Sequence, residues 1–242
     1  MIPAVARVSY DAAMADHLAV VVLAVGGLIA FLIYKVTLLM KEAREEKQRD
    51  LKTLGFEPLD PPPAAVAQPI LALHRRGRTS GHKIERLYER RGSGDRLYLF
   101  NLKDASSGSA RSGVIGAVSP RLRVPRLTIF PRLEGEGRLS ALGNLLLRKL
   151  GQRHGSAVDF GAHSRFSRRH FVSAPDAEAV RRFLTQRRLD CLAQMGPMAV
   201  EAEGDRFTYQ EVHLGRRKAE SHRAETAQRV QHAEELLRIL EG

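Results

Sequence analysis

The run MAVEAEGDRFTYQEV, from Met198 to Val212, has the pattern of a β-hairpin. Apolar and polar residues alternate on both sides of Gly204-Asp205, a dipeptide that is typical of a tight turn. Strands joined by so short a turn run antiparallel. We therefore expect strands at residues 199–202 and 207–212 in an antiparallel sheet.

Upstream of this hairpin, four further runs have the composition of strands. RGSGD forms a turn signal between the first two, and a loop of small polar residues follows the second. The four runs cover residues 82–90, 97–102, 113–118 and 126–132. Their spacing predicts an antiparallel meander, and a further strand is expected within residues 160–172.

Helical periodicity occurs in four segments of the same region. They are residues 138–150, residues 177–184 with Ser173 or Asp176 as the cap, residues 189–195 and residues 217–240. The last carries an apolar stripe that includes Val230, Ala233 and Leu236. The expected fold is α+β: an N-terminal transmembrane helix followed, over residues 70–242, by an antiparallel sheet with helices packed on one face and a long C-terminal helix.

The N-terminal part predicts a membrane anchor. After a short tail, residues 1–17, the run LAVVVLAVGGLIAFLIY from Leu18 to Tyr34 has 17 uncharged residues, and apolar residues continue beyond Lys35 to Met40. A bilayer span needs roughly 20. The acidic residues Asp11 and Asp16 before it disfavour a cleaved signal peptide. We expect residues 18–40 to span the bilayer, with the native start at either Met1 or Met14.

The flanking charges predict the orientation of this span. Six basic residues lie on its C-terminal side, namely Lys35 near its end and five more up to Lys52, whereas only Arg7 precedes it. The positive-inside rule therefore places the domain in the cytoplasm, as a single-pass protein of the cell inner membrane. The single cysteine, Cys191, excludes an intramolecular disulfide and agrees with a reducing compartment. The small-residue pair Gly26 and Ala30 leaves a homo-oligomer open.

Two segments connect the anchor to the domain. Residues 41–56 read as a charged helix in which Glu45 supports Arg49, Leu51 and Leu54 form an apolar edge, and Gly55 is the C-cap. Residues 57–69 hold five of the eleven prolines, which favours an extended linker without a packed core.

The net charge of +12 suggests an anionic partner. Basic pairs recur along the chain, among them Arg181-Arg182 and Arg187-Arg188. Binding of nucleic acid is disfavoured because the aromatic content is 6%, tryptophan is absent and the sequence contains no recognised nucleic-acid-binding motif. Solvated faces and contacts with anionic lipid headgroups account for the charge more simply.

The stretch DFGAHSRFSRRHFV, Asp159 to Val172, is the densest group of chemically suggestive residues. Its Asp-Phe-Gly tripeptide matches protein kinases, but the glycine loop, strand lysine and catalytic-loop aspartate of those enzymes are missing. His163 and His170 would need zinc ligands from elsewhere, such as His74, His82 or His213. We assign no catalytic residue, no metal and no cofactor; the alternative is an unrecognised enzyme centred on Asp159, His163 and His170.

Three segments together resemble a group of uncharacterised bacterial single-pass membrane proteins with a distal domain of unknown function. The segments are LGFEPL at residues 54–59, VDFGAHSRFSRRHFVSAPDAEAVRRFLT at residues 158–185 and EGDRFTYQ at residues 203–210. The resemblance implies an anchored α+β protein and assigns no functional residue. We therefore expect a membrane-anchored module for protein interaction or structural support, with arginine-mediated binding of anionic lipid or polymer as a further alternative.

Overall fold

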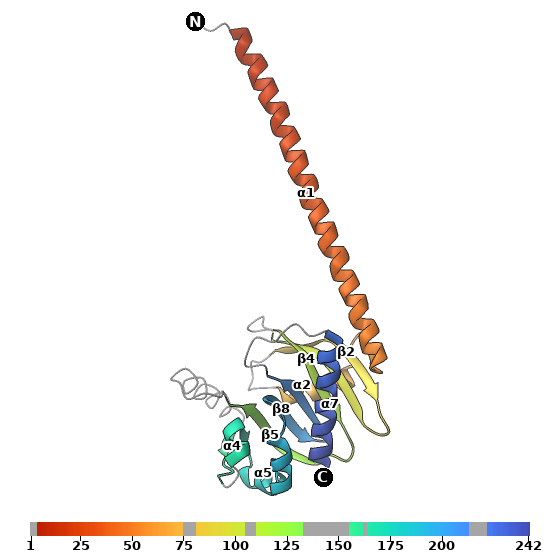
Figure 1. Cartoon of the computed structure of the whole chain (residues 1–242), viewed down its shortest axis with the longest axis vertical. Coiled ribbons are helices and arrows are strands. Elements are labelled where there is room, and N and C mark those ends of the chain that lie inside the picture. The colour runs from red at the N-terminus through yellow and green to blue at the C-terminus, as the bar shows by residue number, and fades with distance from the viewer. Residues whose placement is uncertain (1–3, 75–80, 105–109, 133–154, 162–163, 213–221) are drawn as a thin grey trace. The chain divides into compact units, whose positions relative to one another are not determined.

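The computed structural model describes residues 4–74, 81–104, 110–132, 155–161, 164–212 and 222–242. The side chains of residues 4–27, Ser164 and His222 are not described. The chain divides into two compact units, Met1–Asp50 and Leu51–Gly242 (Figure 1). The folded domain thus begins at Leu51, upstream of the expected boundary at residue 70.

Helix α1, Ala4–Thr53, contains the expected span. Residues 18–27 of that span carry side chains that lie outside the described ones. Within the described part of the chain, no helix combines the length and the apolar character that crossing a membrane requires. After the apolar run, Lys41 and Glu45 form an ion pair at 3.9 Å between Nζ and Oε1.

Gly55 ends α1 in the way that the sequence indicates. Its φ is +79°, in the left-handed region that glycine adopts without steric cost. The N–H of Gly55 donates to the carbonyl of Lys52 at 3.0 Å, and the N–H of Phe56 donates to that of Leu51 at 2.9 Å. These two bonds form a Schellman motif. It turns the chain so that Leu51 and Phe56 are both buried in the domain core.

The expected linker at residues 57–69 is ordered structure instead. Strand β1, Glu57–Leu59, pairs with β2, and helix α2, Ala64–Leu73, begins directly after Pro63. Pro69 lies inside α2 and removes one N–H donor, but Ala67, Ile70 and Leu73 are buried. The apolar contacts of this helix outweigh the missing bond. The expectation of an unpacked linker was wrong because the number of prolines does not reveal which residues are packed.

All strands among the described residues belong to one nine-stranded antiparallel sheet in the order β1-β2-β3-β4-β9-β8-β5-β7-β6. The remaining strands are β2 His82–Arg91, β3 Arg96–Asp104, β4 Ala110–Val118, β5 Val124–Pro131, β6 Ser156–Val158, β7 His170–Ala174, β8 Met198–Gly204 and β9 Arg206–Glu211. The α+β class, the antiparallel sheet and the C-terminal helix are therefore confirmed.

The hairpin β8–β9 lies in the middle of this sheet. Strand β9 pairs with β4, and β8 pairs with β5. The meander prediction is right for β2, β3 and β4 but wrong for β5, because the later hairpin separates β5 from β4. A local turn signal reports which strands are joined, and it does not report which strand is inserted between two others.

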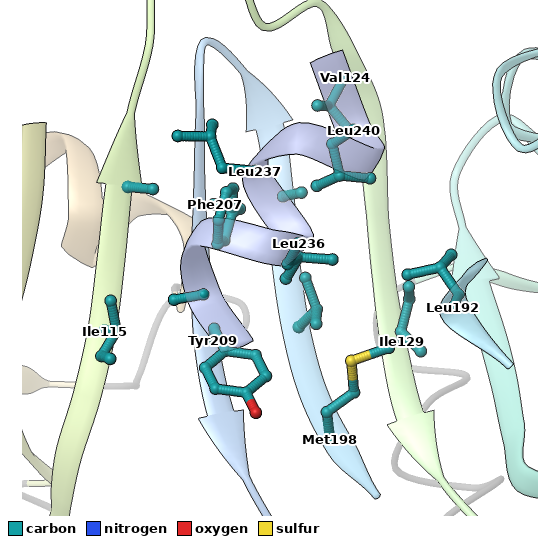
Figure 2. Close-up of a cluster of buried hydrophobic side chains, with 14 of the residues drawn as sticks. Ile115, Val124, Ile129, Leu192, Met198, Phe207, Tyr209, Leu236, Leu237 and Leu240 are labelled. Atoms are coloured by element: carbon teal, nitrogen blue, oxygen red, sulfur yellow. The ribbon is translucent and has the colours of Figure 1, made fainter. Parts of the chain in front are cut away.

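Helices cover both faces of the sheet, and the expected packing on one face is wrong. On one face α2 covers a cluster that includes Leu87, Phe100 and Val114. On the other face α7, His222–Glu241, contacts β4 and β9. Figure 2 shows Leu236, Leu237 and Leu240 of α7 among strand residues such as Phe207. Because successive strand residues point to opposite faces, β8 and β9 serve both layers.

Two short helices, α4 and α5, contact β7, and a third, α6, contacts α4 and α7. The expected strand at residues 160–172 is partly wrong, since Ser164–Arg169 forms helix α4 and only His170–Ala174 is a strand. Phe166 is buried in the core, whereas Phe171 is half-buried and stacks on Phe130 with 5.0 Å between ring centroids. Phe166 is thus the phenylalanine that anchors this segment in the core.

Helices α5, Ala177–Phe183, and α6, Gln186–Leu192, confirm two predicted segments, with α6 starting three residues early. Asp176 caps α5 by accepting the N–H of Ala179 at 2.9 Å. Thr185 caps α6. The expected helix at residues 138–150 and the start of the C-terminal helix at residues 217–221 lie outside the described residues.

Replacing Gly55 by alanine should destabilise the domain by about 1 kcal/mol, because the left-handed conformation is costly for other residues. The added Cβ would also lie 3.3 Å from Cδ of Arg90. Urea unfolding of the full chain, followed by near-ultraviolet circular dichroism, measures the effect, since Tyr88, Tyr98 and Tyr209 are buried in the domain. Gly196→Ala, where a Cβ meets nothing within 4 Å, is the control. Equal stability of the two variants would contradict the role of Gly55.

Candidate functional site

The residues of the enzyme alternative do not form a described site. Asp159 is exposed, and His163 lies outside the described residues. His170 is buried and its ring stacks on Phe166 with 5.3 Å between centroids. The packing around His170 is that of a core side chain.

Burial, together with the smaller effect of the charge of Arg169, lowers the pKa of His170 from 6.5 to about 4. The backbone of Gly196 acts in the opposite direction without restoring the ordinary value. The imidazole is therefore neutral at physiological pH.

A second histidine, His74 at the end of α2, lies in a polar cluster that sequence reasoning missed. Its Nδ1 is 3.2 Å from Oε1 of Glu201, and both side chains are buried. The ring of His82 lies 6.1 Å away, centroid to centroid. Glu201 belongs to the central strand β8 and sits beside Thr208 of β9. Sequence spacing carries no signal for this cluster, because its members come from distant segments.

The cavity beside His74 and Glu201 has a volume of about 10 Å³. That is about the volume needed to hold one water molecule, and far below the size of a substrate site. Among the residues that the structure describes, no group of three or more histidine, cysteine or acidic side chains is placed to hold a metal ion. The cluster thus has the character of a buried polar contact between α2 and the sheet.

A larger pocket, about 310 Å³, lies between the turn at residues 92–95 and the end of α7. Ion pairs line it. Nη2 of Arg121 is 2.6 Å from Oδ2 of Asp95 and 3.2 Å from Oε2 of Glu241, and Arg90 pairs with Glu234. Each carboxylate in these pairs already has an arginine partner, so the pocket offers little unbalanced charge to a ligand. The same ion pairs help to hold α7 against the sheet.

A third depression, which we call the arginine hollow, is different in charge. It is a shallow hollow of about 620 Å³ at the start of β5, between the β8–β9 turn and α5. Its lining residues are Arg123, Val124, Pro125, Ala179, Arg182, Phe183, Arg188 and Gly204. Three of these carry guanidinium groups and none carries a carboxylate. The hollow therefore combines uncompensated positive charge with an apolar floor.

Backbone carbonyls fix the position of Arg188 in the hollow. Its Nη1 donates to Phe183 O at 2.7 Å, its Nε to Ile239 O at 3.0 Å and its Nη2 to Leu240 O at 3.2 Å. The guanidinium also lies over the Phe183 ring at 4.2 Å from its centroid. Burial lowers the pKa of Arg188. The sequence reading of the pair Arg187-Arg188 as a solvated face is thus wrong for Arg188, which ties α5 and α6 to the end of α7.

Comparison with models of known protein families, with curated proteins and with solved structures gave no match. The candidate site therefore rests on the geometry of this chain. Of the three concave sites described above, which are lined by described residues, the arginine hollow alone has arginines in its lining without carboxylates. Its chemistry suits binding of an anion, because its lining supplies donors and apolar surface but no nucleophile paired with a base.

The stability of the domain should fall on mild acidification because of His170. The unfolded histidine binds a proton below its pKa of 6.5, whereas the folded one does so only near 4, so stability drops as pH falls through this interval. His170 should contribute a loss of about 2 kcal/mol between pH 7.5 and pH 5. Urea unfolding at the two pH values measures it.

His170→Phe should remove this contribution, since a phenyl ring has no basic atom that can bind a proton. Subtracting the pH dependence of the variant from that of the wild type isolates the effect of His170 from that of the other histidines. An identical pH dependence in both proteins would show that His170 titrates normally in the fold.

Proposed function

We propose that this chain is a single-pass membrane protein of the cell inner membrane, whose domain Leu51–Gly242 binds a partner protein on the cytoplasmic side. The single observation that carries the proposal is the exposed apolar surface of α1. In the described part of the chain, every exposed large apolar side chain belongs to residues 28–40, with exposed fractions from 36% to 64%. Exposing such apolar side chains to water is unfavourable in free energy, and transferring them to an apolar environment is favourable.

The apolar residues surround the helix on all sides. A helix that pairs with another helix in water needs only an apolar stripe, and its remaining surface is polar. Apart from the phenol of Tyr34, residues 28–40 have only Lys35 and Thr37 as polar side chains. Lipid is the medium that satisfies an all-round apolar surface, and residues 18–27 would extend it to the length of a span.

The two polar side chains are compatible with lipid. The hydroxyl of Thr37 donates to the carbonyl of Ile33 at 2.8 Å, so its bonding capacity is met within the helix. The ammonium of Lys35 lies 5.8 Å from the ring centroid of Phe31, and its long stem can carry the charge to the headgroup region. Neither residue leaves an unsatisfied group in the bilayer.

Binding is favoured over catalysis by the form of the concave sites. The 10 Å³ cavity is too small for a substrate, the 310 Å³ pocket is closed by paired charges, and the arginine hollow is shallow. Asp159 and His170 differ in burial and share no described pocket, so no observation favours the enzyme alternative.

The full chain should remain in the membrane pellet after extraction with alkaline carbonate. Replacing Ile29 and Leu32 together by lysine should release it, because each lysine near the centre of a span costs about 3 kcal/mol. Membrane fractionation followed by immunoblotting measures the distribution. The matched control is Glu42→Lys with Glu46→Lys, which adds the same residue type outside the apolar run and should leave the protein in the pellet. Release of the unmodified chain by carbonate would refute insertion.

The orientation has a separate test that uses the single cysteine. With Cys191 replaced by serine, a new cysteine at the exposed turn residue Ser93 should react with a membrane-impermeant maleimide only after cells are broken. Retention of the domain in the cytoplasm predicts this protection. Labelling of Ser93→Cys in intact spheroplasts would place the domain on the opposite side.

A further inference from the structure

We propose that the arginine hollow is the partner-binding site and that its occupant is an acidic segment of the partner protein with an apolar side chain among its carboxylates. This inference rests on the proposed function in taking the domain to be a binding module. It does not depend on insertion of α1 into lipid.

The charge of the hollow is left uncompensated by the carboxylates around it. Glu203 lies next to the lining residue Gly204 but pairs with Arg126 at 3.9 Å. Asp205 pairs with Arg206 at 2.7 Å, and Glu178 pairs with Arg181. These three carboxylates are thus engaged with arginines outside the lining of the hollow.

Two of the three arginines are held in place before any ligand arrives. Arg188 is fixed by the three carbonyls described above. Nη1 of Arg123 donates at 2.6 Å to the carbonyls of both Pro120 and Leu122. Fixed donors lose little side-chain entropy when a ligand binds.

The third arginine, Arg182, is exposed on α5 and has no ion pair or side-chain hydrogen bond among the described residues. Its guanidinium is available to grip a carboxylate, to which arginine donates two parallel bonds.

The apolar floor narrows the class of ligand. Val124 is buried, and Pro125 and Phe183 are half-buried, so a ligand with charge alone would leave this surface unused. A segment that alternates carboxylates with an apolar side chain complements both parts. The polar headgroups of a bilayer surface would leave this apolar floor without an apolar partner.

Single-stranded nucleic acid fits the hollow less well. Binding of bases relies on open aromatic faces. The Phe183 ring is covered by the guanidinium of Arg188, so the one aromatic residue of the lining is already stacked.

Fluorescence anisotropy of a labelled pentapeptide tests the proposal. The peptide has a leucine flanked by two glutamates on each side, and the full chain is held in micelles of an uncharged detergent. We expect saturable binding that weakens about tenfold or more when sodium chloride is raised from about 0.05 M to about 0.5 M. Arg182→Glu should weaken binding about tenfold, because it turns attraction into repulsion at the hollow.

The matched control is Arg187→Glu, which makes the same charge change at an exposed arginine of α6 that does not line the hollow. It should change the affinity by less than about twofold. Near-ultraviolet circular dichroism verifies that both variants are folded. Equal loss in the two variants would mean that only the overall charge matters, and the proposal would be wrong.

Three further outcomes would overturn it: equal binding of a peptide with glutamines in place of glutamates, tighter binding of an oligothymidylate, or tighter binding of vesicles that contain phosphatidylglycerol. Because the assay is performed in micelles, a failure of peptide binding leaves the carbonate extraction result untouched. A failure of membrane insertion likewise leaves the peptide result intact.

Discussion

The pairing of β8 with β9 is the interaction on which the rest of the domain depends. The outer edge of β9 pairs with β4 through residues 206–209, and the outer edge of β8 pairs with β5 through residues 200–204. Without this hairpin, strands β1 to β4 and strands β5 to β7 would be two small sheets with open edges. The hairpin also presents Phe207 and Tyr209 to α7, and Thr208 and Glu201 to the face of α2. One turn at Gly204 thus supports both halves of the sheet and both helical layers.

Local features of this fold were predictable, and non-local ones were not. The turn at Gly204, the cap at Asp176 and the glycine stop at Gly55 depend on a few neighbouring residues, so the sequence carries their signals directly. The insertion of β8–β9 between β4 and β5, and the meeting of His74 with Glu201, depend on contacts between distant segments. The proline-rich segment misled because proline content predicts an extended spacer, whereas the burial of Ile70 shows that the segment is packed. The arginine hollow was hidden for the same reason: Arg182 and Arg188 look alike in sequence, and only the fold shows that Arg188 is held by three carbonyls while Arg182 is exposed.

The two units differ in where they place their apolar side chains. The domain buries its large apolar side chains within two clusters on the faces of one sheet and leaves arginines at its surface. Residues 28–40 do the opposite, since they keep apolar side chains exposed on every side. The proposed function gives each surface its own medium, lipid for the helix and water or an acidic partner for the domain. The high net positive charge fits this proposal, because it favours anionic partners or surfaces near the domain.

The central claim is that residues 28–40 are surrounded by lipid. The most direct measurement is electron paramagnetic resonance of a spin label at Leu32→Cys, with Cys191 replaced by serine and the full chain in lipid nanodiscs. Collisions with oxygen, which concentrates in the bilayer, are compared with collisions with a water-soluble nickel chelate. The account predicts strong relaxation by oxygen and almost none by nickel. Strong relaxation by nickel would place Leu32 in water and contradict the account.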